Sequence, residues 1–382
     1  FDSKNFLNEG EVAVYRISDI QNDCISTDNC VYVSHDDKFS DFEIQDNDLL
    51  IAMSGATTGK TGLVSGQRGY INQRVGIIRS NYIHYIKYGL RMLMFLDYIV
   101  LLAEGSAQPN ISANGICQYR LPLPPLSEQR SIVSFLDAKC GKIDEWVTKK
   151  QKEVEHLQEL KQRVIADAVT RGLNPHVKMK ATNIPWLKEI PEHWEVLRNK
   201  SILRLTDEKV GNRNDLNLLS LTKQGVIIRD LSEGKGKFPK DFETYLVVRP
   251  NNLVFCLFDI DETPRTVGLV RNYGMLTGAY TNFEVNEDIV LPEYVYCYYL
   301  QIDDVKGLRP YYTGLRKVVK TNTFLQLRMP VPPLSEQKQI VSYLDAKCAK
   351  IDKLIANITK EIECIKEYKQ RLISDVVTGQ IK

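Results

Sequence analysis

The sequence lacks any long apolar run. No stretch approaches the roughly 18 consecutive apolar residues of a membrane-spanning helix, and no apolar segment of the secretory kind opens the chain. These absences argue against a secreted or membrane-embedded protein. They predict a cytoplasmic protein with no membrane partner.

Patterns of metal-binding and catalytic residues are also absent. The five histidines are scattered along the chain, and the eight cysteines form no CxxC pair. The GxSxG, HExxH and glycine-rich cofactor fingerprints do not occur. Cys140 and Cys348 lie on apolar helical stripes, which is typical of small buried side chains. We therefore expect no metal, no cofactor and no enzymatic activity.

One segment resembles a phosphate-binding loop. Residues Ser54–Thr61 read SGATTGKT, but only three residues separate Gly55 from Gly59 where the motif needs four. A glycine-rich turn between strands is the simplest interpretation. The turn could also contact a nucleic-acid phosphate through its amides and Lys60. A nucleotide-dependent enzyme built on Lys60 is an alternative that the sequence leaves open.

The overall charge gives little support to nucleic-acid binding. The net charge is only +2 at pH 7, and residues 1–120 are net acidic. A nucleic-acid surface on this protein therefore has to be a local cluster of basic and polar side chains, not a uniformly basic domain.

The chain does contain one segment twice. LPLPPLSEQRSIVSFLDAKCGKID at residues 121–144 returns as MPVPPLSEQKQIVSYLDAKCAKID at residues 329–352, and the match continues without a gap to Leu173 and Ile381. About 29 of 53 aligned positions are identical, with a period of about 208 residues. This period is too long for a solenoid. It predicts a pseudo-symmetric chain that performs a similar task twice with two different surfaces.

Each copy is expected to form a long helix. Two consecutive prolines precede the helix, Ser127 and Ser335 are suitable N-caps, and Gly172 and Gly379 follow its expected end. Apolar residues recur in alternating steps of four and three, which predicts a coiled-coil seam. Lys161 and Lys369 interrupt this seam at matching positions, and we interpret them as residues that set the register.

The two helices determine the predicted architecture. The first globular unit ends where the first helix begins, and a short polar connector leads from the helix's other end to the second unit. A helix of about 44 residues spans roughly 65 Å. The second helix can bury its seam on the first only by running back along it. We therefore predict an α+β protein in which two mixed, β-rich domains are held apart by an antiparallel two-helix coiled coil, as a pseudo-twofold internal duplication.

Short β-rich runs occur at matching places in the two halves. The predicted strands are Asp48–Ser54, Thr61–Ser65 and Gly76–Arg79 in the first half, and Asn252–Phe258, Thr266–Val270 and Asn282–Val285 in the second. A more helical aromatic stretch follows in each half, at Tyr82–Ala103 and at Pro292–Val305. A similar layout with little identity is typical of two related binding surfaces with different targets.

The repeated motif resembles a known family. PPLSEQ followed by IVSFLD or IVSYLD before a long helix, present twice, is similar to the specificity subunit of type I restriction-modification systems. IPEHW at Ile190–Trp194 and the segment Met53–Gly62 add to this resemblance, which covers nearly the whole chain. It implies two target recognition domains, each of which reads one half of a split, asymmetric site in double-stranded DNA. It also implies that the helices measure the gap and bind two methyltransferase subunits and the motor-nuclease (restriction) subunits.

These expectations define five segments: recognition domain 1 at 1–120, spacer helix 1 at 121–173, a connector at 174–190, recognition domain 2 at 191–328 and spacer helix 2 at 329–382. The second domain opens with Pro185–Trp194, about two dozen residues before its first strand-like run near Leu218. Phe1 lies only about a dozen residues before Val14–Ile17. We therefore expect a leading segment of the first domain to be missing from the sequence.

DNA-contacting side chains are expected where Arg, Lys, Asn, Gln, Tyr, Ser or Thr cluster on loops. In the first domain the candidates are Ser54, Thr58, Lys60, Asn72, Gln73, Arg74, Gln108 and Asn110. In the second domain they are Lys235, Lys237, Thr277, Tyr280, Asn282, Arg309, Tyr312, Arg316, Lys317 and Lys320. An ordinary solvated loop is the competing interpretation for each of these residues.

Apolar residues also lie off the coiled-coil seam. These are Phe135, Trp146, Leu160, Ile165, Tyr343, Leu354, Tyr368 and Ile373. An exposed apolar strip on a helix pair is typical of a surface that binds another protein, but the same residues could pack against the chain's own domains. A duplicated scaffold that binds proteins or other ligands is therefore a further alternative.

Overall fold

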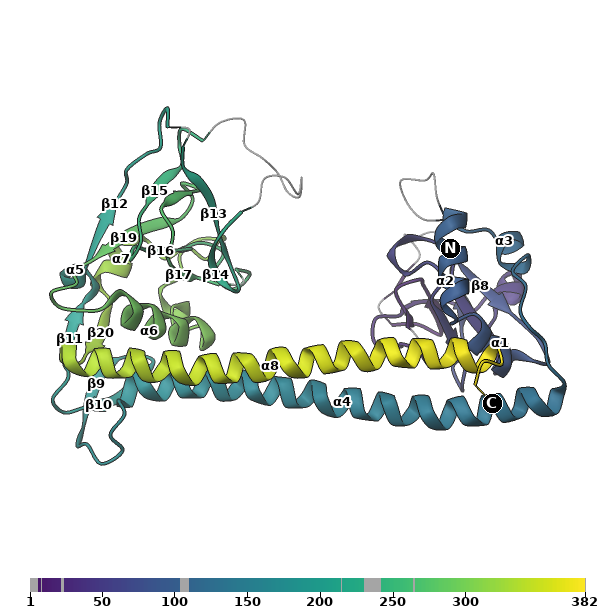
Figure 1. The fold of residues 1–382 in the computed structure, drawn as a ribbon. Helices are drawn as coiled ribbons and strands as arrows, with labels where there is room; N and C mark the ends of the chain where they lie inside the picture. Colours follow the sequence, from purple (N-terminus) through teal and green to yellow (C-terminus); the bar gives the residue numbers. More distant parts are fainter. Residues whose placement is uncertain are drawn as a thin grey trace. The chain divides into compact units, whose positions relative to one another are not determined.

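The computed structural model describes residues 6–7, 9–21, 24–103, 110–213, 215–229, 242–263 and 265–381. The chain divides into two compact units, one made of residues 1–152 and 358–382 and the other of residues 153–357. Each unit therefore combines a β-rich domain with one part of each of the two long helices, α4 (Leu126–Arg171) and α8 (Leu334–Val377), which Figure 1 shows in ribbon form.

The first unit contains short strands followed by short helices. In chain order these elements are β1 (Val12–Tyr15), β2 (Ile20–Gln21), β3 (Cys24–Ile25), β4 (Val31–Val33), η2 (Asp37–Phe42), β5 (Leu49–Ala52), η3 (Gly55–Thr57), β6 (Thr61–Leu63), β7 (Tyr70–Ile71), β8 (Val75–Ile78), α1 (Ile83–Gly89), α2 (Leu93–Ala103) and α3 (Ala113–Cys117).

The second unit repeats this order after an opening β-hairpin. Its elements are β9 (Met179–Ile184), β10 (Leu187–Pro191), β11 (Glu195–Arg198), α5 (Asn199–Ile202), β12 (Leu203–Thr206), β13 (Asn217–Thr222), β14 (Gly225–Ile228), β15 (Leu246–Val248), β16 (Leu253–Phe255), β17 (Val267–Leu269), β18 (Gly274–Leu276), β19 (Thr281–Val285), α6 (Pro292–Asp304), η4 (Arg309–Tyr311), α7 (Thr321–Gln326) and β20 (Arg328–Val331).

The two β-rich domains share the central strand pairings of their sheets, although each of the two larger sheets has three strands in the first domain and four in the second. In the first, β5 pairs antiparallel with both β6 and β8, and in the second β16 pairs antiparallel with both β17 and β19. A parallel pair, β1 with β7 or β13 with β18, belongs to the other sheet. Asn47 and Asn251 hold φ angles of 69° and 71° in the turns before β5 and β16. The predicted strands are confirmed, and the duplication extends to domains whose sequences have diverged.

Each domain packs against both long helices. In the first unit, Tyr85 and Tyr88 of α1 share a buried cluster with Leu136 of α4 and Ile373 of α8. In the second unit, a larger core joins the face of β16, β17 and β19 and helix α6 to Val169 of α4 and to the first turns of α8. The off-seam residues Ile165 and Ile373 are buried in these cores, so they pack against the chain's own domains.

Both long helices begin two residues earlier than serine N-caps at Ser127 and Ser335 would place them. The helices start at Leu126 and Leu334. Ser127 and Ser335 therefore lie within the first helical turn, and the prediction that they are N-caps is wrong. The carbonyl of Pro125 instead accepts hydrogen bonds from the amides of Glu128 and Gln129, at 2.9 and 3.0 Å. Proline suits this position because a residue that opens a helix need not donate its own amide. Gly172, with a φ of 73°, ends α4 as expected.

The predicted seam is confirmed. The seam residues of both helices are buried or half-buried, and the two interrupting lysines form ion pairs across it. Lys369 contacts Asp144 and Lys161 contacts Asp352, each at 2.7 Å. These two pairs are equivalent under the internal repeat, and they show that the helices run antiparallel in each unit. Both ion pairs agree with the expected role of these lysines in setting the register, which stays a prediction.

The connector is more ordered than the sequence indicated. Residues that we expected to form a short polar linker include the hairpin β9–β10, which pairs Leu187 with Ile184 and Pro191 with Met179. Trp186 at its turn donates a hydrogen bond through its indole Nε1 to the hydroxyl of Tyr298, at 3.1 Å, so the hairpin is anchored to α6. None of the helices in the described part of the chain combines the length and apolarity that a bilayer crossing requires.

Candidate nucleic-acid interface

Three predicted segments of the first domain come together where β5 ends. Ser54 forms a backbone bridge with Asn110, and the guanidinium of Arg74 lies 3.4 Å from the Ser54 hydroxyl. The amide of Met53 donates to the carbonyl of Arg74, and the amide of Ile111 donates to the carbonyl of Met53, both at 2.9 Å. Residues that are about 20 and 56 positions from Ser54 therefore form one surface with it.

The glycine-rich segment is a turn, as its spacing predicted. Gly55 and Gly59 have φ angles of 76° and 85°, a region that other residues rarely occupy, and the short helix η3 lies between them. The hydroxyl of Thr58 donates to the carbonyl of Gly55 at 2.7 Å, so Thr58 holds the turn from within. The side chain of Lys60 is exposed immediately before β6.

The loop between β7 and β8 presents Gln73 and Arg74 as exposed side chains. Asn72 is half-buried, and its side-chain oxygen lies 3.4 Å from the amide of Arg74 as an acceptor. Its role in this geometry is to shape the loop that carries its two neighbours. Gln108 lies outside the described residues.

The basic cluster of the second domain is held by two aspartates that follow β16. Asp261 accepts from Arg309 and Tyr312 and pairs with Lys317, in each case at 3.2 Å. Asp259 pairs with Arg316 at 2.7 Å. Four predicted DNA-binding side chains are therefore fixed by carboxylates that sequence reasoning missed. The acidic run after a predicted strand was the available signal.

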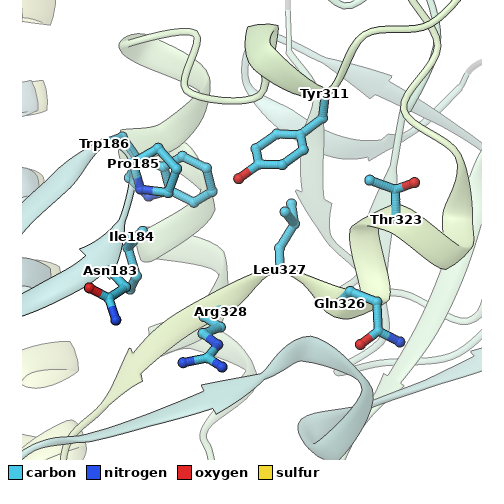
Figure 2. A pocket seen from close by; sticks show the side chains of 9 residues that line it. All are labelled: Asn183, Ile184, Pro185, Trp186, Tyr311, Thr323, Gln326, Leu327 and Arg328. Carbon is cyan, nitrogen blue, oxygen red and sulfur yellow. The ribbon is translucent and has the colours of Figure 1, made fainter.

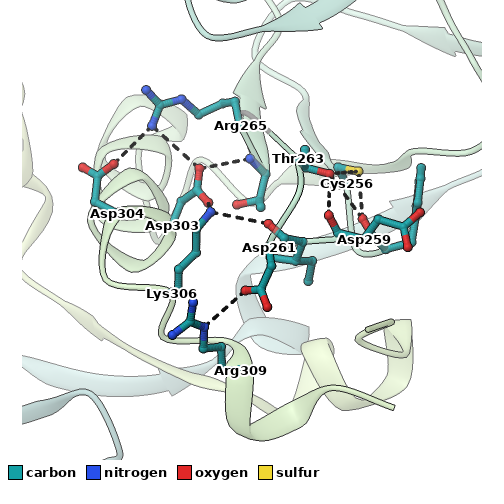
Figure 3. Close-up of polar contacts among 12 residues, drawn as sticks. Cys256, Asp259, Asp261, Thr263, Arg265, Asp303, Asp304, Lys306 and Arg309 are labelled. Carbon is teal, nitrogen blue, oxygen red and sulfur yellow. Dashed lines mark hydrogen bonds and ion pairs between the residues drawn. The ribbon is translucent and has the colours of Figure 1, made fainter. Parts of the chain in front are cut away.

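A second group of ion pairs supports this arrangement. Asp303, near the end of α6, is buried, and its carboxylate receives Lys306 at 3.0 Å and Arg265 at 3.7 Å. The same carboxylate accepts the backbone amide of Thr266, at 3.1 Å. Figure 3 shows these contacts beside the pair formed by Arg309 and Asp261. The loop after β16 and the end of α6 are thereby tied to each other.

The local pKa shifts agree with this network. Burial, reinforced by the adjacent Asp261, raises the pKa of the Tyr312 hydroxyl to about 12, so Tyr312 keeps its proton and can donate it in a hydrogen bond. Burial opposes ionisation of Asp261, but hydrogen bonds from Lys317, Arg309 and Tyr312 outweigh it and lower the pKa of this carboxyl. Asp261 is therefore an anion at neutral pH.

Aromatic side chains extend the cluster toward β19. The guanidinium of Arg316 lies 5.2 Å from the ring centre of Phe258, which stacks on Tyr280 with centroids 6.4 Å apart. Thr277 is half-buried, and its carbonyl accepts the amide of Tyr280 at 3.2 Å. Lys320 is exposed at the start of α7. Lys235 and Lys237 lie outside the described residues.

Asn282 does not fit a direct contact with DNA. Its side chain is buried, and its amide nitrogen donates to the Thr206 hydroxyl at 2.7 Å and lies 3.5 Å from the Asn252 side-chain oxygen. Ser54 is buried as well. Both residues sit where a strand of the β5 or β16 sheet meets its loop, so they position neighbouring side chains. Polar residues at strand ends look alike in sequence whether they face water or the core.

A small cavity lies on the same unit. It has a volume of about 240 Å³ and is lined by residues of the β9–β10 turn, η4, α7 and β20, among them Trp186, Tyr311 and Arg328. Figure 2 shows these side chains around the cavity. The residues that line it include no histidine, cysteine or carboxylate.

Comparisons with known proteins agree with this geometry. A family model for the type I restriction modification DNA specificity domain matches residues 1–156 and 269–364. The chain is 23% identical to the type I restriction enzyme MjaVIII specificity subunit of Methanocaldococcus jannaschii, over 89% of this chain and 80% of that protein. It is 22% identical to the type I restriction enzyme StySPI specificity subunit of Salmonella potsdam, over 99% and 84% of the two chains.

A solved structure shares the fold. It comes from work on complex assembly and conformational transition of the type I restriction-modification system, and it covers 96% of this chain and 91% of its own with a TM-score of 0.70 and 15% identity. The scaffold and nucleotide-enzyme alternatives are not favoured by these relatives. Because the family model matches more than half of its residues, the chain belongs to the family of type I restriction modification DNA specificity domains.

Proposed function

We propose that this protein is the non-catalytic DNA sequence-specificity subunit of a type I restriction-modification complex. Its two recognition domains, at residues 1–120 and 191–328, each read one half of a bipartite, asymmetric site in double-stranded DNA. The helices at 121–173 and 329–382 set the gap between the halves, and residues 174–190 connect them. The observation that carries this proposal is that the same central strand pairings occur in both domains of a chain whose residues 1–156 and 269–364 match the family model for a DNA specificity domain.

DNA contacts are proposed at the loops described above. In the first domain, exposed Lys60, Gln73 and Arg74 surround the end of β5. In the second, the corresponding surface is the cluster of Arg309, Tyr312, Arg316, Lys317, Lys320, Thr277 and Tyr280. Thr58, Asn72, Ser54 and Asn282 support these loops from within, whereas Asn110 is exposed and stays a proposed contact. Gln108, Lys235 and Lys237 stay in the proposal on sequence grounds alone.

The exposed apolar residues of the long helices support two copies of one partner. Phe135 and Tyr343 occupy equivalent repeat positions and are 40% and 37% exposed, while Leu160 and Tyr368 form a second equivalent pair at 46% and 53%. A lysine lies over the first pair in each copy, Lys139 over Phe135 and Lys347 over Tyr343. Two similar surfaces on one chain suit two identical partners. We propose that these are the two methyltransferase subunits, to which the restriction subunits are added.

The proposed compartment is the one that holds the substrate DNA, which is the cytoplasm in a cell without a nucleus. No region of this chain is assigned a catalytic role, since methyl transfer and cleavage belong to the partner subunits in this proposal.

Co-expression with the methyltransferase subunit of the same system tests the function. Methylated bases are then mapped across the host genome, with the methyltransferase expressed alone as the control. The expected result is a single split motif with a fixed gap and one modified adenine in each half, found only when this chain is present. A stable complex that methylates without sequence preference would contradict the proposal.

A further inference from the structure

The most exposed apolar side chain among the described residues stands at the tip of a hairpin in the second domain. Leu315 has a relative exposure of 102%, more than any other large apolar residue in that part of the chain. The hairpin closes between Thr313 and Val318, whose backbones exchange hydrogen bonds of 2.9 and 3.0 Å. Burial of leucine is favourable, so a molecule that covered Leu315 would gain the free energy of removing this side chain from water.

The tip is held in place rather than left loose. Gly314 and Lys317 have φ angles of 70° and 47°, so the turn is tight, and the amide of Lys317 donates to the carbonyl of Gly314 at 3.2 Å. A non-glycine residue with such a φ persists only where surrounding contacts enforce it. The Arg316 carbonyl accepts the amide of Asp259 at 2.8 Å, which fastens one side of the tip to the loop after β16.

Two cations follow the leucine at the tip. Arg316 follows Leu315 directly and is anchored by Asp259 at 2.7 Å and by the ring of Phe258 at 5.2 Å. Lys317 is anchored by Asp261 at 3.2 Å. Arg309, Arg316, Lys317 and Lys320 carry four positive charges against the two carboxylates, so the group keeps a net positive charge.

These features suit one kind of occupant. A polyanion whose charged rim surrounds an apolar stack matches a leucine followed by two cations, and duplex DNA has this arrangement of phosphates around stacked bases. Apolar wedges such as leucine insert between base steps from the minor groove in several DNA-binding folds. We propose that Leu315 is a wedge that enters the DNA at the half-site of the second domain and partly unstacks one base step, while Arg316 and Lys317 contact the adjacent phosphates.

The proposal rests on the proposed function and adds a mechanism to it. A step that unstacks readily, such as TA or CA, is then preferred at the wedge position without a hydrogen bond to either base. Leu315 acts in this way as a specificity residue that reads deformability, whereas the polar side chains nearby read base edges or phosphates.

The test uses the complex of this chain with its methyltransferase subunits and a duplex that carries the mapped motif. 2-Aminopurine, whose fluorescence rises on unstacking, is placed at successive steps of the second half-site. The unchanged protein is expected to raise the fluorescence at one step. Leu315→Ala is expected to remove that rise and to weaken specific binding by about tenfold, while Leu315→Met retains both. Leu205→Ala, an exposed leucine on β12, is the matched control and leaves both unchanged.

The outcomes distinguish a failure of the wedge proposal from a failure of the proposed function. If Leu315→Ala leaves the fluorescence and the affinity unchanged, the wedge is wrong while the DNA-binding function stands. If Leu315→Ala instead weakens assembly with the methyltransferase, the tip is a protein contact and the wedge is also wrong. If the unchanged complex does not prefer the motif over random DNA, the proposed function itself fails. Lys317→Ala is expected to lower the salt dependence of binding by about one ion without removing the fluorescence rise.

Discussion

The proline-rich junction before each long helix has nearly the same sequence in both units but a different environment. In the second unit, β20 carries this junction, and Val331 is 5% exposed because β11 pairs with it across four residues. In the first unit the equivalent Leu123 is 61% exposed, and residues 119–125 adopt no strand. Pro122 is likewise exposed where Pro330 is buried. In the second unit, burial of the junction therefore depends on β11, a strand that lies far from it in the sequence.

Trp194 lies just before β11 and makes further contacts in the second unit. Its side chain is fully buried, and its indole nitrogen donates to the carboxylate of Glu336 at 3.1 Å. It meets the ring of Tyr294 edge-on at 6.5 Å. Tyr85 is the equivalent of Tyr294, since each donates its hydroxyl to a junction proline carbonyl. Glu128, the equivalent of Glu336, is exposed. Tyr85 and Glu128 of the first unit thus correspond to Tyr294 and Glu336 of the second, and Trp194 contacts the latter two.

Replacement of Trp194 is the substitution that we expect to have the largest effect on the second unit alone. We expect Trp194→Ala to destabilise the second unit by about 3–5 kcal/mol, because the change leaves a large cavity and removes the indole donor from the half-buried carboxylate of Glu336. Hydrogen exchange of the full chain should show lost protection in β11 and β20, with the first unit unaffected. The control is Trp146→Ala, a half-buried residue of α4. Equal loss of protection in both units would contradict this account.

Substitutions at the two equivalent junction positions, Val331 and Leu123, test the difference in burial directly. Val331→Ala removes two buried methyl groups and is expected to cost about 2 kcal/mol. Leu123→Ala, at the equivalent exposed position, is expected to change stability by less than about 0.5 kcal/mol. Denaturant unfolding followed separately in each unit by hydrogen exchange measures both values. A larger loss for Leu123→Ala would mean that the first junction is covered in solution.

The smallest expected difference lies between the two equivalent ion pairs. The side chain of Lys369 is 12% exposed and that of Lys161 is 31% exposed, while their aspartate partners are equally exposed. Double-mutant cycles should give coupling energies below about 1 kcal/mol for both pairs, with the larger value for Lys369 and Asp144. Zero coupling in both cycles would show that the lysines do not set the register.

The helical part of the fold could be read from the sequence because its signals are local. Consecutive prolines, a heptad of apolar residues and Gly172 mark the helix limits to within two residues, and Lys161 and Lys369 stood out by interrupting the seam. The matching strand patterns likewise predicted β5 and β16 in equivalent places. The spacing of apolar residues and the start and stop residues suffice to predict such elements, because neighbouring residues specify them.

The candidate interface was less predictable because it depends on distant contacts. Nothing near Arg309 or Lys317 in sequence shows that Asp261 anchors both, about 50 residues away. Asn282 has the composition of a loop residue, but the surrounding sheet buries it. The hairpin that holds Trp186 replaced an expected linker, since its order comes from contact with Tyr298. Side-chain type identified the loops, whereas tertiary pairing decides which of their residues face solvent.

The most direct test of the account is an exchange of one recognition domain. Residues 1–120 are replaced by the corresponding segment of another specificity subunit, and the methylated motif of the resulting complex is mapped. If each domain reads its own half-site, one half of the motif changes while the other half and the gap remain. A change in both halves after this single exchange would contradict the account.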